Sequence, residues 1–299
     1  MNFYKFFKNI FPGFGYLFFL ILTVECLLRA VVFINSKINP PGKFYKSGFY
    51  NIVCIGDSFT YGWGVDRQNT YPKQLEAILN GHMAGRMKFK VFNLGIPGSN
   101  SSQHLISVRE IAASNNKPDL IILLTGANDA WNLADSNLYE LSRQWQVRGY
   151  LTIRIRTMLS NLKIYKMLKV IFLNMRGKTK ESEIDPFKII PKYENIDVDI
   201  LKKLLEYNLT KIIDICRDNE VKIVLQNYPR GDLYGEGDTK AISLANKVPF
   251  VDNYRNFYRE LAMVKPRDLF LYDNSHPNER GYRIMAVGLS ESIAQMTSE

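Results

Sequence analysis

Three residues in this sequence have the side chains and the spacing for nucleophilic acyl transfer. Ser58 follows a short apolar run that ends in glycine, and Asp273 and His276 share one polar segment near the C-terminus. A serine hydroxyl is a weak nucleophile and needs a base within hydrogen-bonding reach. His276 can supply that base, and Asp273 can hold the imidazole in the required tautomer and stabilise its protonated form. The sequence therefore predicts a catalytic set of Ser58, Asp273 and His276.

Acyl transfer also needs hydrogen-bond donors for the oxyanion of the tetrahedral intermediate. The candidates are the backbone N–H of Ser58, the backbone N–H of Gly95 and the side-chain amide of Asn128. One such donor is typically worth about 2.7–4 kcal/mol of transition-state stabilisation. Glycine at position 95 lets the backbone approach a substrate without an intervening Cβ. We expect these three groups to form the oxyanion hole.

The candidate residues follow segments that have the pattern of buried strands. The apolar runs are residues 51–56, 90–93, 119–125, 221–226 and 248–251. Short apolar runs of this kind are typical of parallel strands covered on both faces. In open parallel α/β sheets, active sites collect beyond the carboxyl ends of the strands. The polar clusters after the runs are therefore expected at one edge of one sheet.

Helical patterns alternate with these runs. They cover residues 70–80, 102–114, 200–217 and 279–296. Strands that alternate with helices predict an α/β fold, here with a parallel five-stranded sheet covered on both faces.

Four polar blocks of the chain resemble those of the SGNH (GDSL) hydrolase superfamily, and they occur in the order of that family. The blocks are Gly56-Asp57-Ser58, Gly95, Gly126-x-Asn128-Asp129 and Asp273-x-x-His276. The resemblance covers residues 50–132 and 220–296. The flanking segments 59–64 and 277–278 also resemble the membrane-anchored, envelope-facing bacterial branch of the family.

This resemblance implies a flavodoxin-like three-layer αβα fold, no metal, no cofactor, and hydrolysis or transfer of an ester-linked acyl group. It implies that Ser58 is the nucleophile and the first oxyanion donor, with Gly95 the second donor and Asn128 the third. His276 is then the base, and Asp273 is the acid that orients it. The three cysteines are far apart and form neither a disulfide framework nor a zinc pattern.

Several other polar residues are expected to have local roles. Asp57 is expected to hydrogen-bond its own turn, and Asp129 to cap a helix or brace a loop. His82 and His104 have no evident partner in the sequence and are expected on the surface or in loops.

Three aromatic residues, Tyr61, Trp63 and Trp131, lie beside the polar blocks. They either line the substrate pocket or belong to the core, since ligand pockets share the aromatic character of cores.

The N-terminal segment 10–34 is almost wholly apolar, interrupted by Glu25 and Arg29. As a helix it would be about 37 Å long, enough to cross a bilayer with some tilt. Glu25 and Arg29 are four residues apart and can pair on one helix face. We interpret the segment as a single membrane anchor. The alternatives are a cleaved signal peptide and, third, a buried helix of the domain. The lysines on its two sides do not determine its orientation.

A basic segment accounts for the whole net charge of +10, because residues 141–180 contain ten Lys and Arg and no acid. Apolar residues recur in it at helical spacing from Leu151 to Phe172. The pattern indicates a basic helix over about 150–176 that lies at an anionic membrane surface, or an inserted helix that packs on the domain and borders the active-site cleft. The sequence contains no nucleic-acid-binding motif, so no nucleic-acid partner is expected.

The predicted organisation is an anchor and linker at 1–43 and a hydrolase domain at 44–299, with the helical insertion at about 136–197. We expect an esterase that acts on O-acyl groups, most simply O-acetyl, of an envelope glycan. The first alternative is a polysaccharide O-acetyltransferase with the same triad. The second alternative is a catalytically silent, membrane-tethered glycan-binding protein. The domain is expected in the periplasm or outside the cell, with a membrane acyltransferase as a candidate partner.

Overall fold

The computed structural model of the chain describes residues 16, 19–31, 34, 44–82, 87–130, 132–165, 167–168, 197–231 and 238–298. The chain forms two compact units. The larger comprises Lys43–Tyr150 and Glu183–Glu299, and the smaller comprises Met1–Gly42 and Leu151–Ser182.

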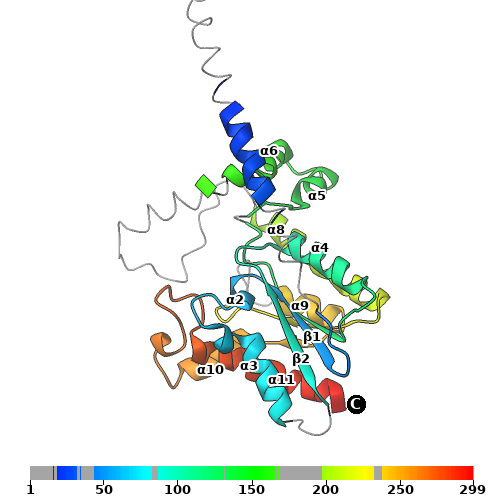
Figure 1. Cartoon of the computed structure of the whole chain (residues 1–299), viewed down its shortest axis with the longest axis vertical. Helices are drawn as coiled ribbons and strands as arrows, with labels where there is room; N and C mark the ends of the chain where they lie inside the picture. Colours follow the sequence, from blue (N-terminus) through cyan, green and yellow to red (C-terminus); the bar gives the residue numbers. More distant parts are fainter. Residues whose placement is uncertain are drawn as a thin grey trace, which may run out of the picture. The chain divides into compact units, whose positions relative to one another are not determined.

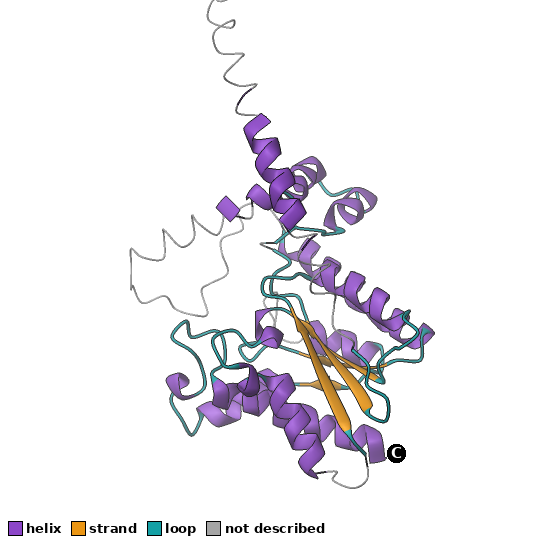
Figure 2. Ribbon diagram, in the orientation of Figure 1, coloured by secondary structure: helices purple, strands orange, loops and turns teal. Residues whose placement is uncertain are grey.

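The larger unit is built on one sheet of five parallel strands (Figures 1 and 2). The strands are β1 (Tyr50–Gly56), β2 (Phe89–Gly95), β3 (Leu120–Leu124), β4 (Lys222–Gln226) and β5 (Phe250–Val251). Their order is β2-β1-β3-β4-β5, and every pairing between neighbours is parallel. The predicted α/β fold with a five-stranded parallel sheet is thereby confirmed. The chain leaves β1 to one side for β2 and returns to the other side for β3, which makes the carboxyl end of β1 the switch point of the sheet.

The strands are apolar because both faces of the sheet are covered. All five residues of β3 are buried. Ile52 and Cys54 of β1 belong to the core cluster on one face, and Val53 and Ile55 to the cluster on the other. This alternation places α3, α10 and α11 on the first face and α4 and α8 on the second, so the unit has three layers (Figure 2).

Four helices of the larger unit lie close to where the sequence predicts them. They are α3 (Tyr71–His82), α4 (Ser101–Ala112), α8 (Val198–Asp218) and α11 (Glu279–Ser298). The structure adds the shorter helices α2 (Ser58–Tyr61), α5 (Leu138–Gln144), α9 (Asp238–Ala245) and α10 (Asn253–Leu261), with the 3-10 turns η1 (Arg67–Asn69) and η2 (Pro266–Asp268). The added helices are too short to show a sustained apolar period.

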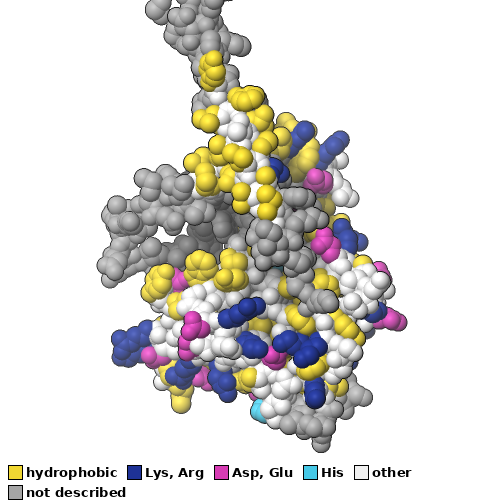
Figure 3. Space-filling view, in the orientation of Figure 1, with side chains coloured by type: hydrophobic (Ala, Val, Ile, Leu, Met, Phe, Trp, Pro, Cys, Tyr) yellow, Lys and Arg dark blue, Asp and Glu magenta, His cyan; other side chains and the backbone are white. Residues whose placement is uncertain are grey.

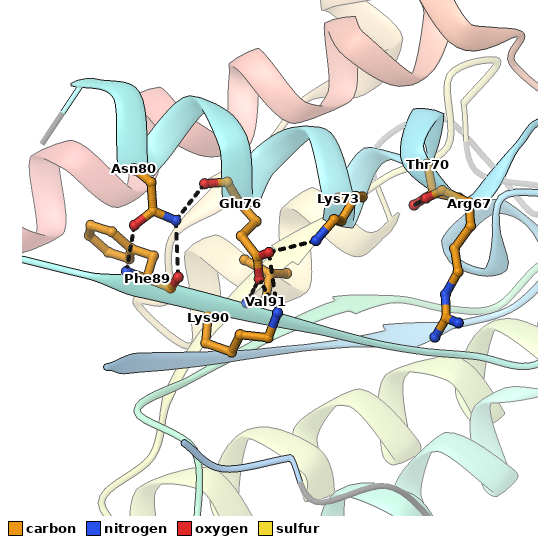
Figure 4. Close-up of polar contacts among 8 residues, drawn as sticks. All are labelled: Arg67, Thr70, Lys73, Glu76, Asn80, Phe89, Lys90 and Val91. Carbon is orange, nitrogen blue, oxygen red and sulfur yellow. Dashed lines mark hydrogen bonds and ion pairs between the residues drawn. The ribbon is translucent and has the colours of Figure 1, made fainter. Parts of the chain in front are cut away.

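Side chains of α3 cover the open edge of β2, as Figure 4 shows. Glu76 accepts a hydrogen bond from the backbone N–H of Val91 at 2.8 Å, and it forms an ion pair with Lys90 at 2.9 Å. Asn80 bonds both the N–H and the carbonyl of Phe89, at 2.9 and 3.0 Å. These contacts satisfy backbone groups that an edge strand would otherwise expose. They also hold β2, and so Gly95 at its end, in place.

In the smaller unit, residues 19–31 are helical, and α6 (Tyr150–Ser160) continues into this unit from residue 151. The prediction of one basic helix over 150–176 is wrong, because α6 ends at Ser160. The N–H groups of Asn161 and Leu162 turn back to carbonyls of the last turn, and a new helical segment begins at residue 163. Residues 166 and 169–196 of the predicted insertion lie outside the described residues.

The predicted membrane anchor, residues 10–34, is described only at 16, 19–31 and 34. Within the part of the chain that the structure describes, no helix has the length and apolar character needed to span a bilayer.

Candidate active site

Ser58 lies directly after β1, as the first residue of the short helix α2. The side chain of Asp57 caps this helix by accepting the N–H of Phe59 at 3.0 Å, and Gly62 ends it in the left-handed conformation. Gly56 is required before the turn, since a Cβ there would lie 2.2 Å from the hydroxyl of Thr60. Because Ser58 is in the first helical turn, no helical carbonyl precedes its N–H, which is left for another acceptor.

The predicted catalytic side chains lie within hydrogen-bonding distance of one another. Ser58 Oγ is 2.8 Å from His276 Nε2, and His276 Nδ1 is 2.6 Å from Asp273 Oδ2. Asp273 Oδ1 accepts the backbone N–H groups of Ser275 and His276, at 2.9 and 3.0 Å. The arrangement can deprotonate Ser58 and orient the imidazole that accepts its proton.

Asp273 is held in its ionised form. Burial raises the pKa of this carboxyl, but the hydrogen bonds from His276 and from the two backbone N–H groups outweigh burial and place the pKa below its ordinary value. A carboxylate at this position can stabilise an imidazolium at His276.

Aromatic rings surround the imidazole of His276. The ring of Phe59 lies 4.6 Å away and that of Trp63 lies 6.4 Å away, centroid to centroid. Of the three aromatic residues predicted for the pocket, Trp63 therefore borders the site. Tyr61 is half exposed on the last turn of α2, and Trp131 lies outside the described residues.

Gly95, the second predicted oxyanion donor, is brought to the same edge by its pairing with Gly56 in the β1–β2 register. A Cβ at this position would lie 2.1 Å from the backbone nitrogen of Tyr61, so only glycine lets β2 approach α2 this closely. Its N–H is bonded to Asn93 Oδ1 at 2.9 Å. Gly95 must therefore share or exchange this bond to donate to an oxyanion.

Asn128, the third predicted donor, is also at this edge and is buried. Its Nδ2 donates to Asp57 Oδ2 at 3.1 Å and to the carbonyl of Ser99 at 2.9 Å. The amide has two N–H groups, so these two bonds engage both of them. As with Gly95, the structure shows Asn128 bonded to the protein itself.

Tyr228 belongs to this site although the sequence reasoning missed it. Its hydroxyl donates to Asp57 Oδ2 at 2.8 Å and accepts the N–H of Ala127 at 3.3 Å. Burial raises the pKa of Asp57 to about 6, against the lowering effect of hydrogen bonds from Phe59 and Tyr228. Tyr228 follows β4 by two residues, so the rule that located Ser58 at a strand end could have located it too.

The expectation that His104 lies on the surface or in a loop is wrong. It lies on α4, is buried, and bonds Ser99 Oγ through Nε2 and Thr125 Oγ1 through Nδ1, both at 2.6 Å. Burial lowers its pKa to about 4, so the ring is neutral at pH 7. Ser99 lies in the loop before α4, whereas Thr125 directly follows β3, so the contact with Thr125 is the one that the local sequence could not indicate. His82 is exposed at the end of α3, as expected.

Asp129 braces a loop, as the sequence suggests. It accepts the backbone N–H of Ser101 at 2.6 Å and the Ser101 hydroxyl at 2.8 Å. These bonds tie the segment after β3 to the first residue of α4, close to Asn128.

Comparison with known proteins identifies one family. The model of the GDSL-like lipase/acylhydrolase family matches residues 54–284. No curated protein sequence matches the chain.

Several solved structures are similar to this chain over most of its length. A catalytic mutant of an acetylxylan esterase from Geobacillus stearothermophilus is 17% identical, with a TM-score of 0.48 over 84% of this chain and 96% of that one. LAE5, an α/β hydrolase enzyme from the metagenome of Lake Arreo, is 18% identical, with a TM-score of 0.49 over 84% and 97%. The psychrotrophic esterase EstA from Pseudoalteromonas sp. is 14% identical, with a TM-score of 0.48 over 83% and 98%.

Proposed function

The chain belongs to the GDSL-like lipase/acylhydrolase family and is a serine hydrolase, and from this premise we propose that it cleaves O-acyl esters through an acyl-enzyme on Ser58. The observation that carries the proposal is the hydrogen-bonded series from Ser58 through His276 to Asp273. A nucleophile, a base and an acid in this order is the arrangement that acyl transfer requires.

The reaction follows from these positions. His276 Nε2 takes the Ser58 proton while Oγ attacks the ester carbonyl, and Asp273 stabilises the resulting imidazolium. The Ser58 N–H meets the developing oxyanion first, and Gly95 and Asn128 complete the hole by redirecting N–H bonds. The imidazolium then protonates the departing alkoxide. Water, activated by the same imidazole, releases the acyl group and regenerates Ser58.

For the substrate, we propose an O-acetyl or similarly small O-acyl ester on an envelope glycan. Exposed rings at the site support a sugar ligand, since Trp63 borders His276 and Tyr272, next to Asp273, is 94% exposed. Such rings can pack against the apolar faces of sugar rings. The envelope itself is proposed from the resemblance of the segments 59–64 and 277–278.

The final acyl acceptor distinguishes an esterase from the alternative, a polysaccharide O-acetyltransferase. Both use the acyl-enzyme, and they differ in whether water or a sugar hydroxyl attacks it. A transferase would have a membrane acyltransferase as a candidate partner.

We further propose that residues 10–34 anchor the protein in a membrane, with the domain in the periplasm or outside the cell. The described part of this helix supports the proposal because its apolar side chains face outward and its acid is buried. Leu20, Leu27 and Val31 are exposed, while Glu25 is 6% exposed. Figure 3 shows apolar side chains over this helix.

The two charges in this helix are satisfied within the smaller unit. Glu25 accepts from Arg29 Nε at 2.7 Å and from the N–H of Ile164 at 2.9 Å, and Arg29 donates to the carbonyl of Asn161 at 3.2 Å. Charged groups in membrane segments pair in this way with one another and with backbone groups. Exposed Leu151, Ile155 and Met158 would place residues 151–168 at the membrane surface.

The function is tested with the full chain in detergent, by measuring acetate release from p-nitrophenyl acetate and from an O-acetylated oligosaccharide. An esterase releases acetate from both. Acetylation of an added, unacetylated oligosaccharide faster than acetate appears would identify the transferase. Turnover of neither ester would overturn the proposal.

A further inference from the structure

A buried carboxylate oxygen beneath the candidate oxyanion hole receives two hydrogen bonds. Asp57 Oδ2 accepts from Tyr228 Oη at 2.8 Å and from Asn128 Nδ2 at 3.1 Å, and Asp57 is 1% exposed. The other oxygen of Asp57 accepts the N–H of Phe59, which fixes the turn at Ser58. One carboxylate therefore joins the loops that follow β1, β3 and β4.

The hydrogen bonds that the Asn128 amide donates limit how it can act. Its two amide N–H groups are directed to Asp57 and to the Ser99 carbonyl. To donate to an oxyanion, one of these N–H groups must change its acceptor. The bond to Asp57 is the longer of the two, at 3.1 Å against 2.9 Å, and its acceptor has a second donor in Tyr228.

We propose that Tyr228 is a positioning residue that allows Asn128 to serve the oxyanion: its hydroxyl keeps Asp57 Oδ2 hydrogen-bonded when the Asn128 amide turns towards the substrate. This role rests on the proposed ester hydrolysis at Ser58. Without the hydroxyl, turning Asn128 would leave a buried carboxylate oxygen with no donor among the described residues, which is costly. Asn128 would then remain bonded to Asp57.

Two further contacts of Tyr228 suit this role. Its oxygen accepts the N–H of Ala127, the residue before Asn128, at 3.3 Å. Its ring packs edge-to-face on Phe59 at 5.0 Å, and Phe59 packs against His276 at 4.6 Å. Phenylalanine at position 228 retains the ring contact and removes only the hydroxyl, so Tyr228→Phe isolates the hydrogen bonds.

The chain offers a matched control in Tyr282. Its hydroxyl is also buried, yet it makes no hydrogen bond with any of the residues that the structure describes. Tyr282→Phe removes the same atom from the same kind of surroundings without freeing an acceptor. We expect Tyr228→Phe to lower kcat on p-nitrophenyl acetate about tenfold or more, with KM within about twofold, since loss of a full oxyanion donor costs about 10²–10³ in kcat. Tyr282→Phe should leave both constants unchanged.

A double-mutant cycle tests whether Tyr228 acts through Asn128. If it does, Tyr228→Phe should lower kcat in the native background and have little effect in the Asn128→Ala background. An equal loss in both backgrounds would overturn the positioning role, as would an unchanged kcat in Tyr228→Phe. A parallel measurement on Ser58→Ala keeps the two proposals apart, because full activity in that variant would contradict the reaction at Ser58 and not the hydrogen-bond relay alone.

Discussion

Ser58 Oγ lies 2.8 Å from His276 Nε2, although 218 positions separate the two residues in the chain. The parallel sheet brings them together, because Ser58 follows β1, which lies between β2 and β3, and the loop of His276 returns to the same edge before α11. Backbone bonds within that loop hold the imidazole in place, with Leu271 N–H donating to the His276 carbonyl at 2.8 Å. The hydrogen-bonded pair of Ser58 and His276 is thus built into the fold.

Replacing the acid tests the orientation of the base. Asp273→Asn is expected to lower kcat by about 10²–10⁴, because a neutral amide cannot stabilise the imidazolium and can select the wrong tautomer. The measurement is kcat on p-nitrophenyl acetate at pH 7.5. Asp66→Asn is the matched control, since Asp66 is exposed and its side chain makes no capping bond to the turn it precedes. Equal rates in the two variants would contradict the assigned role of Asp273.

Gly95 is predicted to be irreplaceable for steric reasons. In Gly95→Ala, the new Cβ would meet the backbone of Tyr61 at 2.1 Å, so α2 and Ser58 must shift. We expect activity to fall at least tenfold with a lower Tm. Gly81→Ala provides the comparison, because nothing lies within 4 Å of that Cβ and alanine favours a helix by about 0.5–1 kcal/mol. A Gly95→Ala enzyme as active as the native protein would show that the close approach is unnecessary.

The buried carboxyl of Asp129 predicts a pH-dependent stability. Burial raises its pKa to about 7, despite hydrogen bonds from Ser101 that lower it. Between about pH 3.9, the pKa of Asp in an unfolded chain, and pH 7, the Asp129 carboxyl is protonated in the folded state and ionised in the unfolded state. Stability contributed by this group is therefore present at low pH and is lost as the pH rises through about 7.

Asp129→Asn removes this titration. Relative to the variant, the native protein should lose on the order of a few kcal/mol of unfolding free energy between pH 5 and pH 8, measured by urea denaturation. His104, whose lowered pKa acts in the opposite direction, is present in both proteins and cancels in the comparison. A difference that stays constant with pH would show that Asp129 titrates normally.

Much of the fold was predictable because β1 and β3 are covered on both faces, which makes them continuous apolar runs. The grouping of Ser58 with Asp273 and His276 was predicted from residue types, from the position of Ser58 after a strand and from the resemblance to the SGNH hydrolases. The bonds of Asn128 and the contribution of Tyr228 depend on which side chains meet across loops, and no local pattern encodes that.

The predictions for His104 and for the basic helix were wrong for the same reason, because both depend on tertiary contacts. His104 has an ordinary helical neighbourhood, yet it is buried and bonds Ser99, in the loop before α4, and Thr125, directly after β3. The helical period of the basic segment runs past Asn161, yet the chain turns there, and the following N–H of Ile164 bonds to Glu25 in the same unit. Periodicity reports which residues favour a helix, but tertiary contacts decide where it ends.

The central claim, that Ser58 is the nucleophile, is tested most directly by labelling the full chain with a fluorophosphonate and locating the adduct by mass spectrometry. The native protein should carry one label on the peptide containing Ser58. Ser114→Ala, altered two residues beyond the C-terminal end of α4, should label equally. Ser58→Ala should carry none. A label of equal intensity in Ser58→Ala, or an adduct on another residue of the native protein, would contradict the account.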